Sequence, residues 1–296
     1  MKTTIHCLAI ALTSLLFAAL AQAQNLFVTD WGNGEAGGGS IYEFTPNEGS
    51  STFASGLSAP CGLAFNSAGN LFEADALSGN IYEFATNGGS STFASGLSLP
   101  NGLAFDSAGN LFVASDNDNG PGAIYKFTTN GGSSTFASGL NWPVGLAFNS
   151  AGNLFEADYG SGHIYEFTPN GGSSTFASGL GGPAGLTFNS AGNLFDADYG
   201  SGNIYEFTTN GTQSTFASGL GVGGPNEMAF NSAGRLFEAN DSSGNIYEFT
   251  TNGVRTTFAS GLSDAIAVAF QPIPEPSTLA LVGLGVIALL GVRRRN

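Results

Sequence analysis

Residues 265–277 read AIAVAFQPIPEPS, and the first six letters repeat the opening of a unit that occurs five times earlier in the chain. In an earlier copy, residues 62–75 read GLAFNSAGNLFEAD and lead into a complete unit of about forty residues. The last copy stops at residue 270. Because an unpaired strand leaves its backbone groups exposed, this fragment predicts a complementary fragment elsewhere in the chain.

The chain contains six units, each with an IYEF or IYKF tetrapeptide followed by the phenylalanine of TFASGL. Both series step by 40, 43, 40, 40 and 42 residues. Each unit has four short apolar runs separated by Asn, Gly and Ser, which predicts four antiparallel strands, A to D, joined by tight turns. In the second unit these are residues 62–65, 70–75, 80–86 and 91–95.

Four strands in forty residues are typical of a β-propeller blade, whereas a β-solenoid, the second alternative, repeats at about half that period. The first unit starts at strand B, with NLFVTD at residues 25–30, and residues 267–270 form a strand A without successors. The two fragments together make one blade. We therefore expect an all-β, six-bladed propeller over residues 24–272, closed by pairing 267–270 with the N-terminal three-stranded blade.

Two stretches, PNGLAFDSAGNLFVAS (100–115) and PAGLTFNSAGNLFDAD (183–198), resemble the repeats of NHL-type six-bladed propellers. The resemblance covers nearly all of the chain between its two ends. It implies the architecture far more than a function, because one fold hosts many activities.

The N-terminus has the three parts of a secretory signal peptide, which we predict over residues 1–23. Lys2 provides the positive charge, an apolar run extends to Leu20, and Ala21-Gln22-Ala23 offers a cleavage site. Cleavage would remove Cys7 and leave Cys61 as the single thiol, so we expect no internal disulfide.

Residues 273–296 combine a Pro-Glu-Pro motif, an uncharged apolar segment at 278–292 and a terminal arginine cluster. This order resembles the PEP-CTERM sorting signal. The resemblance implies an exosortase-type processing enzyme as partner, a short transmembrane helix as transient inner-membrane anchor, and a final place on the surface or in the extracellular matrix of a Gram-negative-type bacterium. The residues that carry it are Pro274, Glu275, Pro276, Arg293, Arg294 and Arg295.

The segment between the two signals carries 21 acidic side chains against Lys126, Arg235 and Arg255, a net charge of −18 (3 − 21). Nucleic acids and anionic lipids bind through positive charge. The negative net charge therefore argues against nucleic acids and anionic lipids as partners.

Loop lengths vary on one face only. The A–B and C–D steps are constant, whereas the B–C step is 15, 13 or 10 residues and one D–A step is longer than the others. Binding residues favour variable loops on a rigid scaffold. Aromatic rings beside Asn and Asp suit a saccharide, so a polysaccharide is a possible partner, although the same rings could simply pack over the channel mouth. The binding candidates are Trp31, Asn101, Trp142, Tyr159, Tyr199 and Asn226.

The residues that open the A strands should surround the channel mouth, and gluconolactonase-type propellers hold a divalent metal there. Asn101 and Asn226 look like two such ligand positions, which makes a metal-dependent lactonase or esterase the alternative function. We expect these two residues to face each other across the channel. The six predicted mouth residues are Cys61, Asn101, Val144, Ala184, Asn226 and Ile266.

Two acidic patterns remain. Asp30, Asp75, Asp158 and Asp198 end the B strands and are expected to cap turns. Asp116, Asp118 and Asn119 resemble the start of a calcium loop but lack its later glutamate, which indicates at most a weak Ca²⁺ site. No catalytic residue and no other cofactor is predicted. The main expectation is an exported, non-catalytic binding or structural module linked to extracellular polysaccharide.

Overall fold

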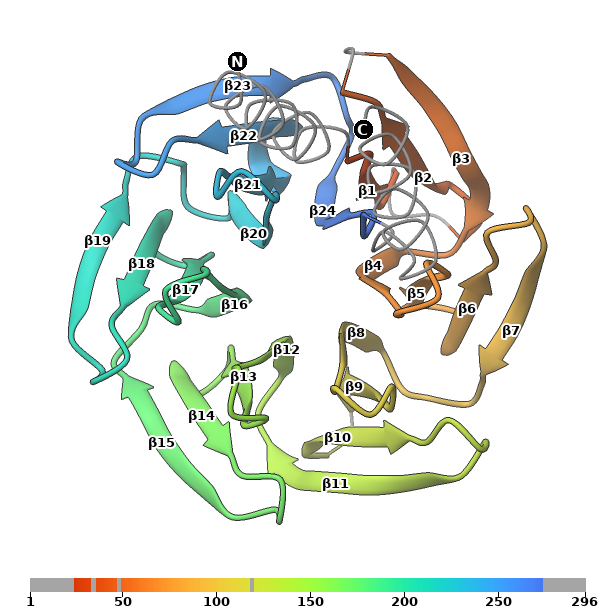
Figure 1. Cartoon of the computed structure of the whole chain (residues 1–296), viewed down its shortest axis with the longest axis horizontal. Coiled ribbons are helices and arrows are strands. Elements are labelled where there is room, and N and C mark those ends of the chain that lie inside the picture. The colour runs from red at the N-terminus through yellow and green to blue at the C-terminus, as the bar shows by residue number, and fades with distance from the viewer. Residues whose placement is uncertain (1–23, 33–35, 47–48, 118–119, 274–296) are drawn as a thin grey trace, which may run out of the picture.

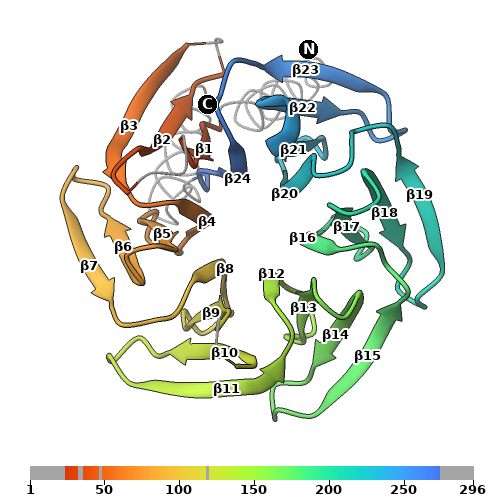
Figure 2. The same cartoon turned by 180° about the vertical axis from the view of Figure 1, so that it is seen from behind.

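Six four-stranded antiparallel sheets stand around a central axis like the blades of a wheel (Figures 1 and 2). The computed structural model describes residues 24–32, 36–46, 49–117 and 120–273. The architecture is the predicted six-bladed propeller. The predicted signal peptide and the segment at 278–292 lie outside the described residues.

The strands follow the chain from the axis outward in every blade but the first. Blade 1 has β24 (Ala265–Phe270), β1 (Leu26–Asp30), β2 (Gly39–Phe44) and β3 (Ser50–Leu57), and blade 2 has β4 (Pro60–Phe65), β5 (Leu71–Asp75), β6 (Asn80–Phe84) and β7 (Ser90–Ala94). Blade 3 has β8 (Pro100–Phe105), β9 (Leu111–Ser115), β10 (Gly122–Phe127) and β11 (Ser133–Leu140), and blade 4 has β12 (Pro143–Phe148), β13 (Leu154–Asp158), β14 (His163–Phe167) and β15 (Ser173–Ser178). Blade 5 has β16 (Pro183–Phe188), β17 (Leu194–Asp198), β18 (Asn203–Phe207) and β19 (Gln213–Ala217), and blade 6 has β20 (Pro225–Phe230), β21 (Leu236–Asn240), β22 (Asn245–Phe249) and β23 (Arg255–Ala259).

The last strand closes the ring as expected. β24 pairs antiparallel with β1, with Val28 opposite Val268 and Leu26 opposite Phe270. The strand starts at Ala265, two residues earlier than the sequence suggested, and a bulge between Val28 and Asp30 absorbs the register change.

Phenylalanines repeat the same contacts between all neighbouring blades. A strand-B ring meets the strand-A ring of the next blade edge-on, as between Phe72 and Phe105 at 5.0 Å. Phe270 takes this place against Phe237, with centroids also 5.0 Å apart. The closing strand therefore fills the same core position as the other five A strands. Edge-to-face pairs of this kind add to the free energy gained by burial.

Glycine lets the innermost strands approach each other. A Cβ added at Gly102 would overlap the carbonyl oxygen of Val144, and one added at Gly145 would overlap that of Ala184. The third residue of strand A is glycine in blades 2 to 5 for this reason, whereas blades 6 and 1 have Glu227 and Ala267.

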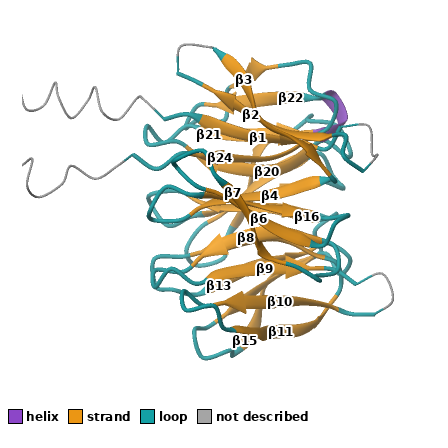
Figure 3. Cartoon of the chain, turned by 90° about the vertical axis from the view of Figure 1, so that its right-hand side faces the viewer, coloured by secondary structure: helices purple, strands orange, loops and turns teal. Residues whose placement is uncertain are grey.

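The B–C and D–A links meet on one side of the wheel, here called the mouth face. Figure 3 shows the short 3-10 helix η1 (Asp241–Ser243), which belongs to the B–C link of blade 6, at this side. Within the described ranges, no helix is long and apolar enough to cross a membrane.

Candidate ligand site at the channel mouth

A cavity of about 290 Å³ opens where the channel reaches the mouth face. Its floor is a ring of one residue from each A strand. This is the ring expected from the sequence, and Asn101 and Asn226 belong to blades 3 and 6, which stand opposite each other (Figure 1). The floor residues are Cys61, Asn101, Val144, Ala184, Asn226 and Ile266.

A second ring lies above the floor and is formed by the residue that follows each B strand. In every blade the backbone N–H of this residue donates to a carbonyl of the preceding D–A link, as from Tyr159 to Trp142 at 3.1 Å. Six equivalent hydrogen bonds therefore fix the rim. Its residues are Trp31, Ala76, Asp116, Tyr159, Tyr199 and Asp241.

The aspartates that end the B strands hold these links in place. Asp158 Oδ1 accepts from Ser161 N at 3.1 Å, which confirms the predicted turn cap, and its Oδ2 accepts from Asn141 N at 2.7 Å. Asp30, Asp75 and Asp198 bind both loops in the same way. In each of these four blades, one aspartate carboxylate thus connects the B–C link to the preceding D–A link by hydrogen bonds.

Three aromatic side chains form a continuous arc on one side of the cavity. The rings of Trp142 and Tyr159 lie 4.9 Å apart, and those of Tyr159 and Tyr199 lie 6.1 Å apart. The Tyr199 hydroxyl donates to Asp241 Oδ2 at 3.0 Å, which continues the arc into blade 6. The structure therefore brings all six predicted binding residues around one cavity.

Trp142 stands out within the arc. It is 51% exposed and has a φ of 61°, in the left-handed region that side chains other than glycine rarely adopt. Ala59 and Leu99, which precede the strand-A proline in blades 2 and 3, share this left-handed conformation, so the backbone geometry belongs to the repeat. What distinguishes Trp142 is its large, exposed ring at a position that is alanine in blade 2 and leucine in blade 3.

Trp31 lies across the cavity from Trp142, because blades 1 and 4 are opposite. Its indole N–H is buried and has no hydrogen-bond partner among the described residues. The side chain of Trp31 lines the cavity, but its N–H is shielded from solvent.

Four carboxyl groups are buried between blades, and the sequence interpretation missed them. Glu73, Glu156, Asp196 and Glu238 occupy the middle of strand B and are fully buried. Except for one Glu238 oxygen, which accepts from the Asn240 amide at 3.1 Å, their oxygens have no hydrogen-bond partner within the described part of the chain. Burial raises the pKa of Glu238 to about 8 and raises the pKa of the other three well above the usual range.

In blades 1 and 3, valine occupies the strand-B position that carries a carboxyl group in the other four blades. Val28 and Val113 are buried against the preceding blade. Comparison of LFEAD with LFVTD and LFVAS could have revealed that the acidic position is a core position.

Two further groups lie near the floor. Glu227 is half-buried, and burial raises its pKa to about 8. Cys61 is buried; its burial, followed by the charges of Glu73, Asp75 and Glu227, raises the pKa of the thiol. The thiol is therefore protonated and unsuited to act as a nucleophile at neutral pH.

The floor fits a resident divalent metal poorly. Asn101 and Asn226 stand on opposite blades, and no group of three His, Cys, Asp or Glu side chains suited to a metal occurs among the described residues. Hard cations require six or more oxygen ligands. Of the predicted calcium candidates, only Asp116 lies in the described part, at the rim; Asp118 and Asn119 lie outside it.

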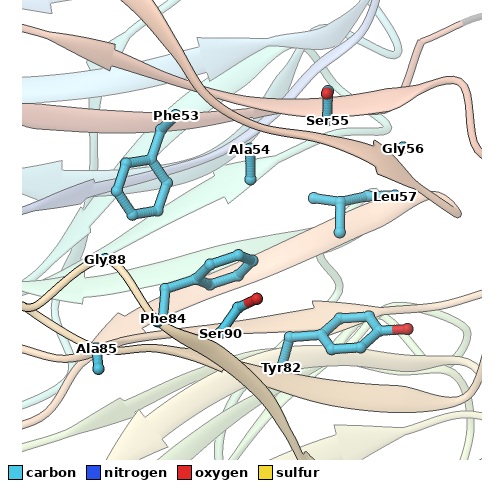
Figure 4. A pocket seen from close by; sticks show the side chains of 11 residues that line it. Phe53, Ala54, Ser55, Gly56, Leu57, Tyr82, Phe84, Ala85, Gly88 and Ser90 are labelled. Atoms are coloured by element: carbon cyan, nitrogen blue, oxygen red, sulfur yellow. The ribbon is translucent and has the colours of Figure 1, made fainter.

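A larger groove of about 440 Å³ lies at the circumference between blades 1 and 2 (Figure 4). Figure 4 shows Phe53 and Phe84 on its two sides, with ring centroids 5.5 Å apart. The equivalent ring pair recurs between all neighbouring blades at 5.5 to 6.0 Å. The groove is therefore a consequence of the repeat, whereas the mouth residues differ from blade to blade.

Residues 272–295 match the model of the PEP-CTERM protein-sorting motif. The chain carries a PEP-CTERM signal. This signal means that the propeller is exported, sorted through a membrane-anchored form and processed by exosortase-type machinery. Of these residues, the structure describes only 272 and 273.

A comparison with curated proteins found no match to the sequence. Among solved structures, the chain is similar to one from a nidogen/laminin complex, with a TM-score of 0.72, 18% identity, and coverage of 85% of this chain and 99% of the other. It is also similar to virginiamycin B lyase from Staphylococcus aureus, with a TM-score of 0.63, 15% identity, and coverage of 84% of this chain and 93% of the other. A gluconolactonase from Xanthomonas campestris is similar with a TM-score of 0.62, 20% identity, and coverage of 70% of this chain and 78% of the other. At these identities the likeness shows the fold alone.

Proposed function

We propose that the exported propeller is a non-catalytic module that binds a saccharide at its channel mouth and acts at the cell surface or in the extracellular matrix. The arc of Trp142, Tyr159 and Tyr199 around one side of the cavity carries the proposal. Flat rings with a polar edge suit the apolar face and the hydroxyl groups of a sugar. The side-chain amides of Asn101 and Asn226 provide directional hydrogen bonds within the same cavity.

The sorting signal supports this setting. Processing near Pro274-Glu275-Pro276 would release the propeller from a transient inner-membrane anchor formed by residues 278–292. The six blades are complete within residues 24–273, so the propeller does not depend on the anchor for its fold.

Hydrolysis of lactones or esters is the alternative suggested by the gluconolactonase-like fold. The floor of the cavity offers opposed amides and a protonated thiol, which are poor groups for metal-assisted or nucleophilic hydrolysis. The geometry therefore favours binding over catalysis.

Replacing Trp142 with alanine is expected to reduce saccharide retention at least tenfold without unfolding the protein, because the side chain is half exposed and contributes little core packing. The measurement is a binding screen against immobilised neutral, basic and acidic polysaccharides, with the melting temperature recorded in parallel. Leu77→Ala is the matched control, since Leu77 is 52% exposed on the same face but does not line the cavity. Equal retention by both variants and the parent would show that the arc is only packing.

A further inference from the structure

Among the described residues, the charged side chains at the mouth are acidic. The rim contributes Asp116 and Asp241, and the D–A link before β24 adds Asp264. The basic residues of the described chain are engaged elsewhere: Lys126 lies 3.7 Å from Asp106, Arg235 lies 2.8 Å from Glu248, and Arg255 lies over the ring of Tyr247. None of them lines the cavity.

Acidic groups crowd at the junction of blades 6 and 1. Asp30 accepts from the backbone N–H groups of Ser263 and Asp264, which places its carboxylate beside the link that carries Asp264. Burial, and then the charge of Asp264, raise the pKa of Asp241; burial, and then the charge of Asp30, raise that of Asp264. Tyr199 donates one hydrogen bond to Asp241, and no described cation neutralises the group.

Electron-rich ring faces lie next to this negative group. The arc leads from Trp142 through Tyr159 and Tyr199 directly to Asp241. A cation is attracted to the faces of Trp and Tyr, and a concave site lined by one sign of charge concentrates counter-charged ligands. A polyanion would instead be repelled, both by the rim and by the net charge of the exported segment.

We infer that the mouth selects saccharides that carry protonated amino groups, such as polymers of free hexosamine, over neutral and acidic ones. The sugar ring packs on Trp142 and Tyr159, and its ammonium group lies against Asp241. This inference rests on the proposed function and specifies the ligand class for the same cavity.

The test compares three soluble probes of equal length: a glucosamine trimer, its fully N-acetylated form and a galacturonate trimer. Titration calorimetry on the exported chain is expected to show at least tenfold tighter binding of the glucosamine trimer than of the N-acetylated trimer, and no binding of galacturonate. The preference should weaken as NaCl rises from about 50 to 500 mM, because screening weakens charge pairing.

Asp241→Asn is expected to weaken glucosamine binding about tenfold and to reduce the preference for the glucosamine trimer over the N-acetylated trimer. Asp106→Asn is the matched control, because it also removes one carboxylate, lies in the A–B link of blade 3, and restores the asparagine found there in blades 2, 4, 5 and 6. If Asp241→Asn lowers the melting temperature, Asp264→Asn provides the second variant.

Two results separate the proposals. Equal affinity for the glucosamine and N-acetylated trimers, or equal effects of the Asp241 and Asp106 substitutions, would overturn the charge selection and leave saccharide binding intact. Absence of binding to all three trimers and to the polysaccharide screen would overturn both.

Discussion

Deleting residues 265–270 is expected to abolish cooperative folding of the propeller. The deletion removes β24, whose backbone hydrogen bonds to β1 contribute about 1 kcal/mol each to the free energy of unfolding. It also exposes the site now filled by Ile266 and Val268, whose burial contributes about 1.5–3 kcal/mol apiece. Together these losses rival the whole stability of a domain, about 5–15 kcal/mol.

The measurement is thermal unfolding followed by circular dichroism, with size-exclusion chromatography to detect aggregates. Val268→Ala is the milder comparison: it keeps the strand and should lower the melting temperature by several degrees while unfolding stays cooperative. A truncated protein that melts at the temperature of the parent would be incompatible with closure by β24.

A fall in stability between pH 5 and pH 8 is the second large effect that we expect. Glu73, Glu156, Asp196 and Glu238 have folded-state pKa values above their unfolded values because burial penalises the charged form. The folded protein therefore binds more protons than the unfolded chain in this window. The free energy of unfolding is greatest at the acidic end and decreases as pH rises toward the folded pKa, by up to about 1.4 kcal/mol per pH unit for each group.

Glu156→Val tests this directly, because valine occupies the same buried position in blades 1 and 3 as Val28 and Val113. The variant should be more stable than the parent at pH 8, and its stability should depend less on pH. Thr175→Val serves as the control. Thr175 is uncharged and exposed on β15, the outermost strand of the blade that contains Glu156. Parallel stability–pH curves for the parent and Glu156→Val, measured by denaturant titration, would contradict the assignment.

Most of the architecture could be predicted because the repeat is close to exact. The distances between successive IYEF motifs fixed the number of blades, and the missing strand A at the start fixed the closure. The limits were local: the sequence placed the closing strand at 267–270, whereas Ala265 and Ile266 also belong to it, because pairing continues past a bulge to Asp30 opposite Ala265.

The mouth residues could be located from strand order and loop length, but their interactions could not. Nothing in the spacing indicates that Trp142 meets Tyr159 or that Tyr199 donates to Asp241, since these contacts depend on how neighbouring blades are inclined. Asp241 and Asp264 were not singled out, because they lie 23 residues apart in two different links. The four buried carboxyl groups of strand B were missed because a charged residue in a strand is ordinarily assigned to the solvent-exposed face of the sheet.

Closure is the claim on which both fold and site depend, because Trp31 and Ile266 line the cavity from the closing blade. Residues directly opposite in an antiparallel pair lie close enough for a disulfide. Val28 and Val268 are such a pair. The most direct measurement is therefore oxidation of a Val28→Cys, Val268→Cys variant of residues 24–273 in which Cys61 is replaced by alanine.

The structure predicts rapid formation of a single intramolecular disulfide, visible by mass spectrometry of a peptide that joins the two ends of the chain. Failure to cross-link under native conditions, or cross-linking only between molecules, would contradict a ring closed by its own last strand.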